Sequence, residues 1–470
     1  MIRRLRLLSS ASLLLLVSGC GFLLESDYQT PEVTVPSQWQ MASATSTVPA
    51  ATGIDRWWQD FNDPALNALV TEALAKNNDL AAATLKVRQA QLEVGLAEND
   101  FLPVFSGTAD AQRQDTLSSP KTTTKTYSVT GGVSWELDLW GRVARETDAK
   151  DWEAKATAQD RDETALSLVG TVVDLYWQLG YLSERLALSD QSIAYAEKTL
   201  QLVQVQHGAG AASALEELEA KQSLASQQAN RTELVQQQEE ARNALAILFD
   251  GPPGTSHAEP TAMPQTALPA VAGGLPAQVL ARRPDIQAAE LRLRETLSEG
   301  DATKASYFPT ISLTGSLGSS SIALTDLMKN PIGTLGAGVT LPFLNLNEML
   351  LNIKVSKVEY QTAVVNYRQT LYSALSDVEN ALSARTQYNA QAEKLEQSLD
   401  AARKTEALYE ARYRAGAVPL KSWLDAQETR RTAEEALAEN RYNRLVNHTT
   451  LCEALGGGPK LDGTTAVASN

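Results

Sequence analysis

The residue types that most often carry catalysis or bind metals are few and scattered in this chain. Its three histidines, His207, His257 and His448, have no partner at the spacing of a metal-binding motif. The sequence contains no Walker loop, no nucleophile elbow and no paired catalytic cysteine. Most carboxylates fall on expected helix surfaces, where solvation is their ordinary role. We therefore expect no enzyme activity and no cofactor.

The two cysteines suggest a membrane anchor instead. Cys20 follows three arginines and the apolar run 7–17, as in a secretory signal peptide. The run is shorter than the roughly 20 residues that a membrane-spanning helix needs. The ending "LLVSGC" resembles a bacterial lipoprotein signal, which implies a covalent lipid on Cys20 and, with Gly21 next, sorting to the outer membrane. Cys452 is then left alone, which excludes a disulfide framework and makes it a small buried residue.

Length and charge narrow the class further. A chain of 470 residues exceeds the usual size of one domain, so two structural units are expected. Hydrophobic residues at 43% and charged residues at 21% are typical of a folded protein. The net charge of −15 argues against a nucleic-acid partner, because phosphate binding relies on Lys and Arg.

Internal similarity indicates a duplicated unit. One constant shift of 206 residues places Phe101-Leu102-Pro103 on Tyr307-Phe308-Pro309 and Gly210 on Gly416. Each half is expected to contain a long helix, two strands, a very long helix and another long helix. The halves are joined by a segment rich in Pro, Ala and Gly.

The longest helices must pack along a seam. Residues 343–415 contain neither Gly nor Pro, so as one helix they would reach roughly 110 Å. Apolar residues in this segment and in 165–203 recur at alternating steps of four and three, which indicates a coiled coil. The expected partners are helices 211–248 and 420–455, which follow glycine turns. Each half therefore ends in a long antiparallel hairpin.

A second period, of two residues, predicts four strands. Apolar and polar residues alternate as in a membrane strand, although a soluble sheet with one buried face gives the same pattern. Four strands cannot close a barrel, and lipid does not tolerate an open sheet edge. Strands from several copies are therefore expected to close a barrel together. The expected strands are 102–112, 127–139, 311–317 and 335–343, with exposed loops at 113–126 and 318–332.

Several stretches resemble one known family. "SVTGGVSWELDLWGRV", "LARRPDIQAAELRL" and "RYRAGAVPLKSWLDAQ" resemble the TolC family of outer-membrane factors, in its OprM-like lipoprotein branch, and similarity extends from Trp57 to Pro459. The resemblance implies a mainly α fold with membrane β-structure, built from a duplicated unit of long coiled-coil helices plus two strands. A homotrimer of such chains would form a twelve-stranded β-barrel in the outer membrane and an α-helical tunnel in the periplasm.

The resemblance also implies a function. The trimer would be the passive exit duct of a tripartite efflux system, conducting small molecules that an inner-membrane RND-type pump delivers through a periplasmic adaptor. The outer component of a type I protein secretion system is the alternative, because it uses the same fold. A purely structural coiled-coil lipoprotein would not need alternating strands in both halves. Four tryptophans fit core packing or membrane-interface anchoring better than a ligand platform: Trp57, Trp58, Trp135 and Trp140.

The family's entrance constriction falls on the second glycine turn. An aspartate of the "LDAQ" motif lines it, which here is Asp425. Three such carboxylates around one axis would repel anions and attract cations, as an electrostatic filter or a cation-binding plug. Ser422 stands where some relatives have a second aspartate, and Lys421 where the OprM-like branch has a gating leucine. Lys421 would then offset part of the charge of the ring.

Links between the two hairpins complete the expected gate. Tyr413 matches the tyrosine that the family uses, and Glu216 matches its acidic partner on the first hairpin. Arg412 and Arg414 flank Tyr413 and are candidates to pair with Glu216 or Asp425. Charged residues at a helix turn are also often simply solvated.

The expected organisation follows from these features. It comprises a lipoprotein signal peptide (1–19), a lipidated extended anchor (20–56), repeat 1 (57–255), a linker (256–274), repeat 2 (275–459) and a C-terminal tail (460–470).

Overall fold

The computed structural model describes residues 24–40, 54–265, 267–269, 271, 276, 281–459 and 461. The expected signal peptide and Cys20 lie outside these residues. The chain forms two compact units, which we call the strand unit and the hairpin unit. The strand unit contains the described residues of 1–33, 86–158 and 288–369, and the hairpin unit contains those of 34–85, 159–287 and 370–470.

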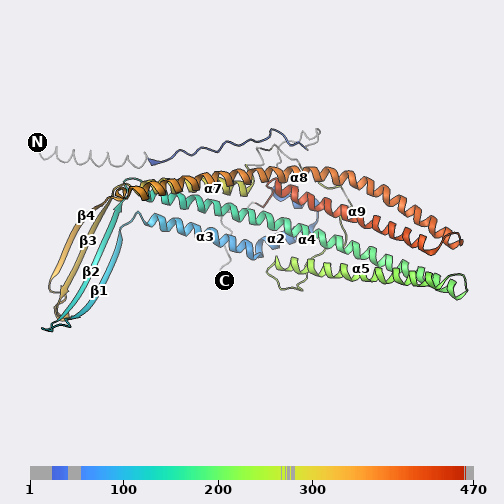
Figure 1. Cartoon of the computed structure of the whole chain (residues 1–470), viewed down its shortest axis with the longest axis horizontal. Coiled ribbons are helices and arrows are strands. Elements are labelled where there is room, and N and C mark those ends of the chain that lie inside the picture. Colours follow the sequence, from blue (N-terminus) through green and yellow to red (C-terminus); the bar gives the residue numbers. More distant parts are fainter. Residues whose placement is uncertain are drawn as a thin grey trace. The chain divides into compact units, whose positions relative to one another are not determined.

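The order of elements repeats, as the internal similarity predicts (Figure 1). The first half contains η2 (Ile54–Phe61), α2 (Pro64–Lys76), α3 (Asn78–Asn99), β1 (Val104–Asp115), β2 (Thr123–Leu137), α4 (Arg142–Gly208) and α5 (Ala214–Ile247). The second half contains α7 (Pro284–Ala305), β3 (Thr310–Ser321), β4 (Pro331–Thr340), α8 (Leu346–Arg414) and α9 (Leu420–Ala454), with short 3-10 turns η3 (Leu324–Asp326) and η4 (Pro342–Leu344).

The long helices confirm the prediction from glycine and proline. α8 extends over 69 residues and α4 over 67, and each is followed by its hairpin partner, α9 or α5 (Figure 1). Seam residues are buried on α4 and on α8, for example Leu179 and Val378. None of the described helices combines the length and the hydropathy needed to cross a bilayer.

The two hairpin turns are built in the same way. Gly210 and Gly416 have φ angles of +74° and +69°, which residues with a Cβ rarely adopt. The N–H of Ala211 donates to the carbonyl of Gln206 at 2.8 Å, and that of Ala417 donates to the carbonyl of Arg412 at 2.9 Å. Each glycine therefore ends a long helix with a left-handed residue that satisfies the last carbonyls.

The strand unit holds one antiparallel sheet in the order β1-β2-β3-β4. The two halves meet where β2 pairs with β3, from Tyr127 opposite Ser321 to Leu137 opposite Ile311. The connection between β1 and β2 is shorter than the predicted loop 113–126, and that between β3 and β4 is shorter than the predicted loop 318–332. In each case the strands extend into residues that were predicted to be loop. Threonines opposite β1, such as Thr123 paired with Asp115, extend the ladder, since β-branched residues fit a strand.

The register gives this sheet one apolar face. Phe105, Val133, Gly315 and Leu335 lie side by side across the four strands. Since side chains alternate between faces, the next row on the same face passes through Trp135, Leu313 and Ala337. The opposite face carries mainly Ser, Thr and Gly. The apolar face is open to its surroundings, with Leu335 93% exposed and Phe105 80% exposed.

The N-terminal segment of the strand unit is held by polar contacts. The Glu25 carboxylate pairs with Arg145 of α4 at 2.9 Å. The backbone N–H and the hydroxyl of Ser26 donate to the two oxygens of Asp301 on α7, at 2.6 and 2.7 Å. The Arg294 guanidinium lies over the ring of Tyr28. Residues 25–28 are therefore fixed along α4 and α7.

Candidate functional site at the helix turns

A small apolar core joins the two turns. It consists of Val203 of α4, Ala220 of α5, Tyr413 of α8, and Leu420 and Trp423 of α9. The rings of Tyr413 and Trp423 stack with centroids 5.4 Å apart, and Trp423 is only 2% exposed. The first turn of α9 is therefore clamped between α4 and α8 by aromatic packing.

Tyr413 does link the two hairpins, but through a different partner from the predicted one. Its hydroxyl donates to the side-chain carbonyl oxygen of Gln206, at 2.8 Å. Glu216 instead forms a capping box at the start of α5, where its carboxylate accepts the Ser213 N–H at 2.8 Å. Burial, and after it the nearby negative charge of Glu216, raise the pKa of Tyr413. The tyrosine is therefore a neutral donor, and Glu216 acts on it through its charge.

The arginines beside Tyr413 make contacts on their own helix rather than with the candidate partners Glu216 and Asp425. Arg414 forms an ion pair with Glu410 at 2.7 Å, rather than with Glu216 or Asp425. The guanidinium of Arg412 lies 6.0 Å from the ring centre of Tyr409. Both contacts are local on α8, because residues three or four apart share a face of a helix.

Glu410 has a second partner that the sequence reasoning missed. The Tyr195 hydroxyl on α4 donates to the Glu410 carboxylate at 3.1 Å. Burial, followed by the charges of Glu406 and Glu410, raises the pKa of Tyr195. Since Tyr195 also packs edge-on against Trp423, at 6.2 Å between ring centres, it connects α4 to both α8 and α9.

A polar cluster continues this connection along the helices. Arg430 of α9 pairs with Glu406 of α8 at 2.5 Å and with Glu434 at 2.7 Å. Arg403 of α8 pairs with Glu434 at 3.0 Å. A cavity of about 280 Å³ lies beside the cluster, lined also by Tyr195. Each charged group of the cluster has an oppositely charged partner, as partly buried ions require.

The "LDAQ" segment presents its charges outward. The Asp425 carboxylate and the Lys421 ammonium lie 3.3 Å apart, and their side chains are 65% and 68% exposed. Ser422 lies between them in the first turn of α9, where its N–H donates to the Pro419 carbonyl at 3.2 Å. Lys421 therefore contacts Asp425 within one chain, and both groups remain open to ions or to another molecule.

His448, His257 and Cys452 pack inside the hairpin unit, whereas His207 is exposed beside the first turn. Burial, reinforced by the Arg385 charge, lowers the pKa of His448 to about 4, so its ring is neutral; it lies edge-on to Phe61 with centres 5.2 Å apart. His257 stacks on Phe249 at 4.2 Å. Cys452 is buried, as predicted. Across the described part of the chain, no group of three His, Cys, Asp or Glu residues is placed to hold a metal ion.

Three of the linking residues escaped the sequence reasoning for different reasons. Gln206 is a neutral amide near the C-terminal end of α4, and its type and spacing did not indicate a link. Glu410 precedes Arg414 by four residues, so its ion pair was visible in the i, i+4 spacing. Tyr195 lies between positions of the apolar seam expected for α4, so the seam did not mark it, and it is only partly buried.

Comparison with known proteins identifies the family. The chain matches the family described as outer membrane efflux protein over residues 69–249 and 275–457. It is 31% identical over 471 residues to the pyoverdine export outer membrane protein OpmQ of Pseudomonas aeruginosa, with 97% of each chain covered. It is 29% identical over 462 residues to a probable outer membrane lipoprotein, SilC, of Salmonella typhimurium, covering 97% of this chain and 99% of that one.

A solved structure agrees with the fold. The open state of the Neisseria gonorrhoeae MtrE outer membrane channel is 31% identical, with a TM-score of 0.80 over 94% of this chain and 99% of that one. The matched segments correspond to the two halves of the duplication. The chain therefore belongs to the outer membrane efflux protein family, the TolC family, and is an outer-membrane channel of the efflux type rather than an enzyme.

Proposed function

We propose that three copies of the chain form a passive exit duct for small molecules. The observation that carries this proposal is the four-stranded sheet, which has an exposed apolar face and ends in the edge strands β1 and β4. An apolar face of this extent is stable when lipid covers it, and its edges need pairing in lipid. Pairing β1 of one copy with β4 of the next, three times, gives a barrel of twelve strands.

The partners follow from the same role. A passive duct needs an energy source elsewhere, and we propose that an inner-membrane RND-type pump delivers substrate through a periplasmic adaptor. The family description and the export function in the name of OpmQ support this arrangement.

The gate is proposed at the helix turns of the hairpin unit. The Tyr413–Gln206 and Tyr195–Glu410 hydrogen bonds would hold the α8–α9 hairpin against α4 in the closed state. Asp425 from three copies would form the acidic constriction, and Lys421 would reduce its charge. Arg412, Arg414 and Glu216 support the turn locally, because their contacts lie on their own helices.

Single-channel recording tests the duct and the gate together. The full-length protein in planar bilayers is expected to show a small closed conductance that increases in the double variant Tyr413→Phe/Asp425→Asn. The matched control is Tyr372→Phe/Asp400→Asn, with both residues on α8. Tyr372 is exposed, and Asp400 pairs with Lys404 at comparable exposure to the Asp425–Lys421 pair. Equal conductance in the two double variants would contradict the proposed gate. The absence of any conductance would contradict the proposed duct.

The number of copies is tested separately. Native mass spectrometry in detergent is expected to give a mass of three chains. A monomer as the largest species would contradict the shared barrel even if single channels were seen.

We also propose that Cys20 carries the lipid anchor. The N-terminal sequence and the lipoprotein relative SilC support this modification, and the fixed segment 25–28 begins five residues later. Mass spectrometry of the mature N-terminal peptide should find diacylglycerol on the Cys20 sulfur. An unmodified Cys20, or a mature protein that starts elsewhere, would refute the anchor.

A further inference from the structure

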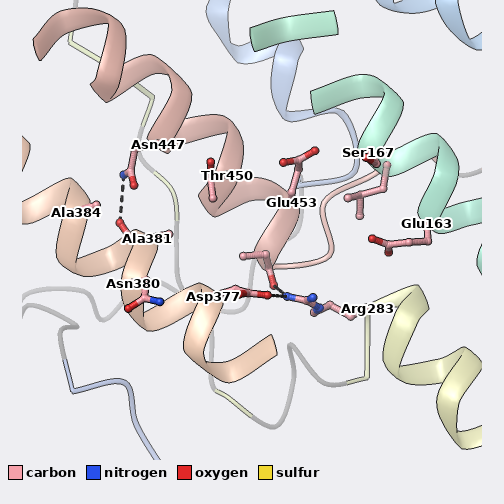
Figure 2. A pocket seen from close by; sticks show the side chains of 12 residues that line it. Glu163, Ser167, Arg283, Asp377, Asn380, Ala381, Ala384, Asn447, Thr450 and Glu453 are labelled. Carbon is pink, nitrogen blue, oxygen red and sulfur yellow. Dashed lines mark hydrogen bonds and ion pairs between the residues drawn. The ribbon is translucent and has the colours of Figure 1, made fainter. Parts of the chain in front are cut away.

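A polar cavity in the hairpin unit lies far along the helices from the turns. Its volume is about 400 Å³, and its walls come from α4, α8, α9 and the residues before α7. Figure 2 shows Glu163 on α4, Glu453 on α9 and Arg283 and Asp377 around it. Three carboxylates and one guanidinium therefore share this space, and the proposed duct and gate assign no role to them.

Glu453, which lines the cavity, packs closely against a glycine of α4. A Cβ on Gly170 would lie 1.8 Å from one carboxyl oxygen of Glu453 and 2.4 Å from its carboxyl carbon. The carboxyl group therefore occupies the space that a side chain at position 170 would take. This packing places the last turn of α9 directly against the backbone of α4.

The groups facing Glu453 are mostly acidic. On α4, Glu163 and Asp174 flank Gly170 on one face of the helix, because they lie seven residues before it and four after it. One oxygen of Asp174 has no hydrogen-bond partner among the described residues. From α8, Asp377 lines the same cavity.

Arg283 is the basic group of this cavity, but its donors are already engaged. It binds both oxygens of Asp285, at 3.0 and 2.7 Å, and it also contacts Asp377 and the carbonyl of Ala454, each at 3.3 Å. Figure 2 shows its guanidinium directed toward Asp377, while the Glu453 side chain extends toward α4. No ion pair or hydrogen bond to Glu453 or Glu163 is found within the described residues, so neither carboxylate binds a cation directly, and Arg283 acts on them only through its charge.

These surroundings favour the protonated form of Glu453. Burial, followed by the charges of Asp174 and Glu163, raises the pKa of Glu453 to about 8, and the charge of Arg283 opposes this as the smallest of these effects. Burial also raises the pKa of Asp174 to about 6 and that of Glu163. An uncharged carboxyl can pack on the Gly170 backbone, whereas an ionised one is repelled by its neighbours and draws water.

We propose that the Glu453 carboxyl and Gly170 form a proton-dependent contact that fixes the end of α9 against α4. With its proton, Glu453 packs on Gly170. When the proton is lost, the side chain turns into the adjoining cavity, and the last turn of α9 loosens. Because α9 begins at the turn that carries Asp425, alkaline conditions relax the anchored end of the hairpin that bears the gate. The contact itself lies within the hairpin unit and does not depend on the gate assignment.

The expected dependence on pH has a definite sign. An acid whose pKa is higher in the folded protein binds its proton more tightly there than in the unfolded chain. Glu453 then contributes its full stability below pH 4.5, the ordinary glutamate value, and loses it as pH rises through about 8. The contact is therefore weakest above pH 8.

Thermal unfolding of the full-length channel in detergent tests this contact. The Tm of the wild type is expected to fall by roughly 5 °C between pH 6 and pH 9. In Glu453→Gln, which is uncharged at every pH, most of this fall disappears. Glu439→Gln is the matched control on the exposed face of α9 and should retain it. A level wild-type Tm, or an equal fall in Glu453→Gln, overturns the proposal.

A second variant tests the geometry while Glu453 is kept. In Gly170→Ala the new methyl group takes the place of the carboxyl, and the cavity gives the flexible Glu453 side chain room to move. Alanine is also the better helix former. This variant should fold, lose the pH dependence and exceed the wild type in Tm at pH 9. Gly170→Ala with the wild-type pH dependence would contradict the contact.

Hydrogen exchange supplies a readout that needs no variant. Amides of residues 445–455 in the wild type should lose protection between pH 6 and pH 9, after correction for the intrinsic pH dependence of exchange. Amides near Trp423 should not. Equal changes at both places would show general loosening, and the proposal would fail.

Discussion

The two ends of α9 are held against α4 in opposite ways. At the first turn, Leu420 and Trp423 are buried, and the charges of Lys421 and Asp425 are exposed. At the last turn, the carboxyl of Glu453 is packed on Gly170 among other acids. The first contact is apolar with solvated charges around it, and the second places an ionisable group inside the contact.

This difference decides what each end responds to. Solvated charges contribute little to stability, so the first turn can use them to act on passing ions without weakening the fold. A buried carboxyl couples packing to its own proton, so the last turn responds to pH. Substitutions along α9 and its neighbours should therefore separate effects on stability from effects on conduction.

The largest effect on stability is expected at the apolar end. Trp423→Ala should lower the free energy of unfolding by about 3–5 kcal/mol, because it leaves a cavity between Tyr413, Tyr195 and Leu420. Denaturant unfolding in detergent measures it. Leu215→Ala on the exposed side of α5 is the control. A cost below about 1 kcal/mol would mean that aromatic packing does not fix this turn.

The hydrogen bond from α4 to α8 should rank next. Tyr195→Phe removes the donor to the Glu410 carboxylate and should cost about 1.5–3 kcal/mol, since the acceptor is charged and partly buried. Tyr372→Phe on the exposed face of α8 should cost almost nothing. If the two variants unfold alike, Tyr195 is only a packing residue.

The left-handed glycine at the second turn, Gly416, should contribute less to the free energy of unfolding. Gly416→Ala forces a side chain into a φ of +69° and should cost about 1–2 kcal/mol, although no atom crowds the position. Gly208→Ala, within α4 and at an ordinary φ, should be neutral or stabilising. The difference between Gly416→Ala and Gly208→Ala measures the backbone strain at position 416. Equal Tm values of the two variants would argue against such strain.

The smallest effect on stability is expected from the exposed ion pair. Lys421→Ala should change the free energy of unfolding by no more than about 0.5 kcal/mol, as for other exposed i, i+4 pairs. Its effect should appear in bilayers as a higher preference for cations, since Asp425 is then uncompensated. Lys404→Ala, which breaks the exposed ion pair with Asp400 on α8, is the matched control. An unchanged ion preference would separate Lys421 from the conduction path.

Helices, strands and turns followed from local chemistry. The absence of Gly and Pro between 343 and 415 predicted α8, which extends from Leu346 to Arg414. The strand loops were predicted too long, because Ser, Thr and Lys suggested exposure, although exposed residues also extend strands when a partner strand continues opposite them. Polarity alone does not show where a ladder ends.

The site was predictable only in part. Gly416, Tyr413 and Asp425 were located by their place in one motif, and the contact of Lys421 with Asp425 follows from helical spacing. The hydrogen-bond acceptor of Tyr413 was not predicted, because Gln206 lies 207 residues away and only the packing of α4 against α8 brings it into reach. The same packing decides the Tyr195–Glu410 bond.

From the order of residues alone came the duplication, the long helices, the strand alternation and the two glycine turns. Each of these depends on neighbours within a few positions or on a repeated pattern. The tertiary structure alone decided that the four strands form one sheet with an apolar face, and that Glu453 packs on Gly170 among acids while Arg283 binds Asp285. Burial and charge compensation depend on which distant segments meet, and spacing along one chain does not specify that.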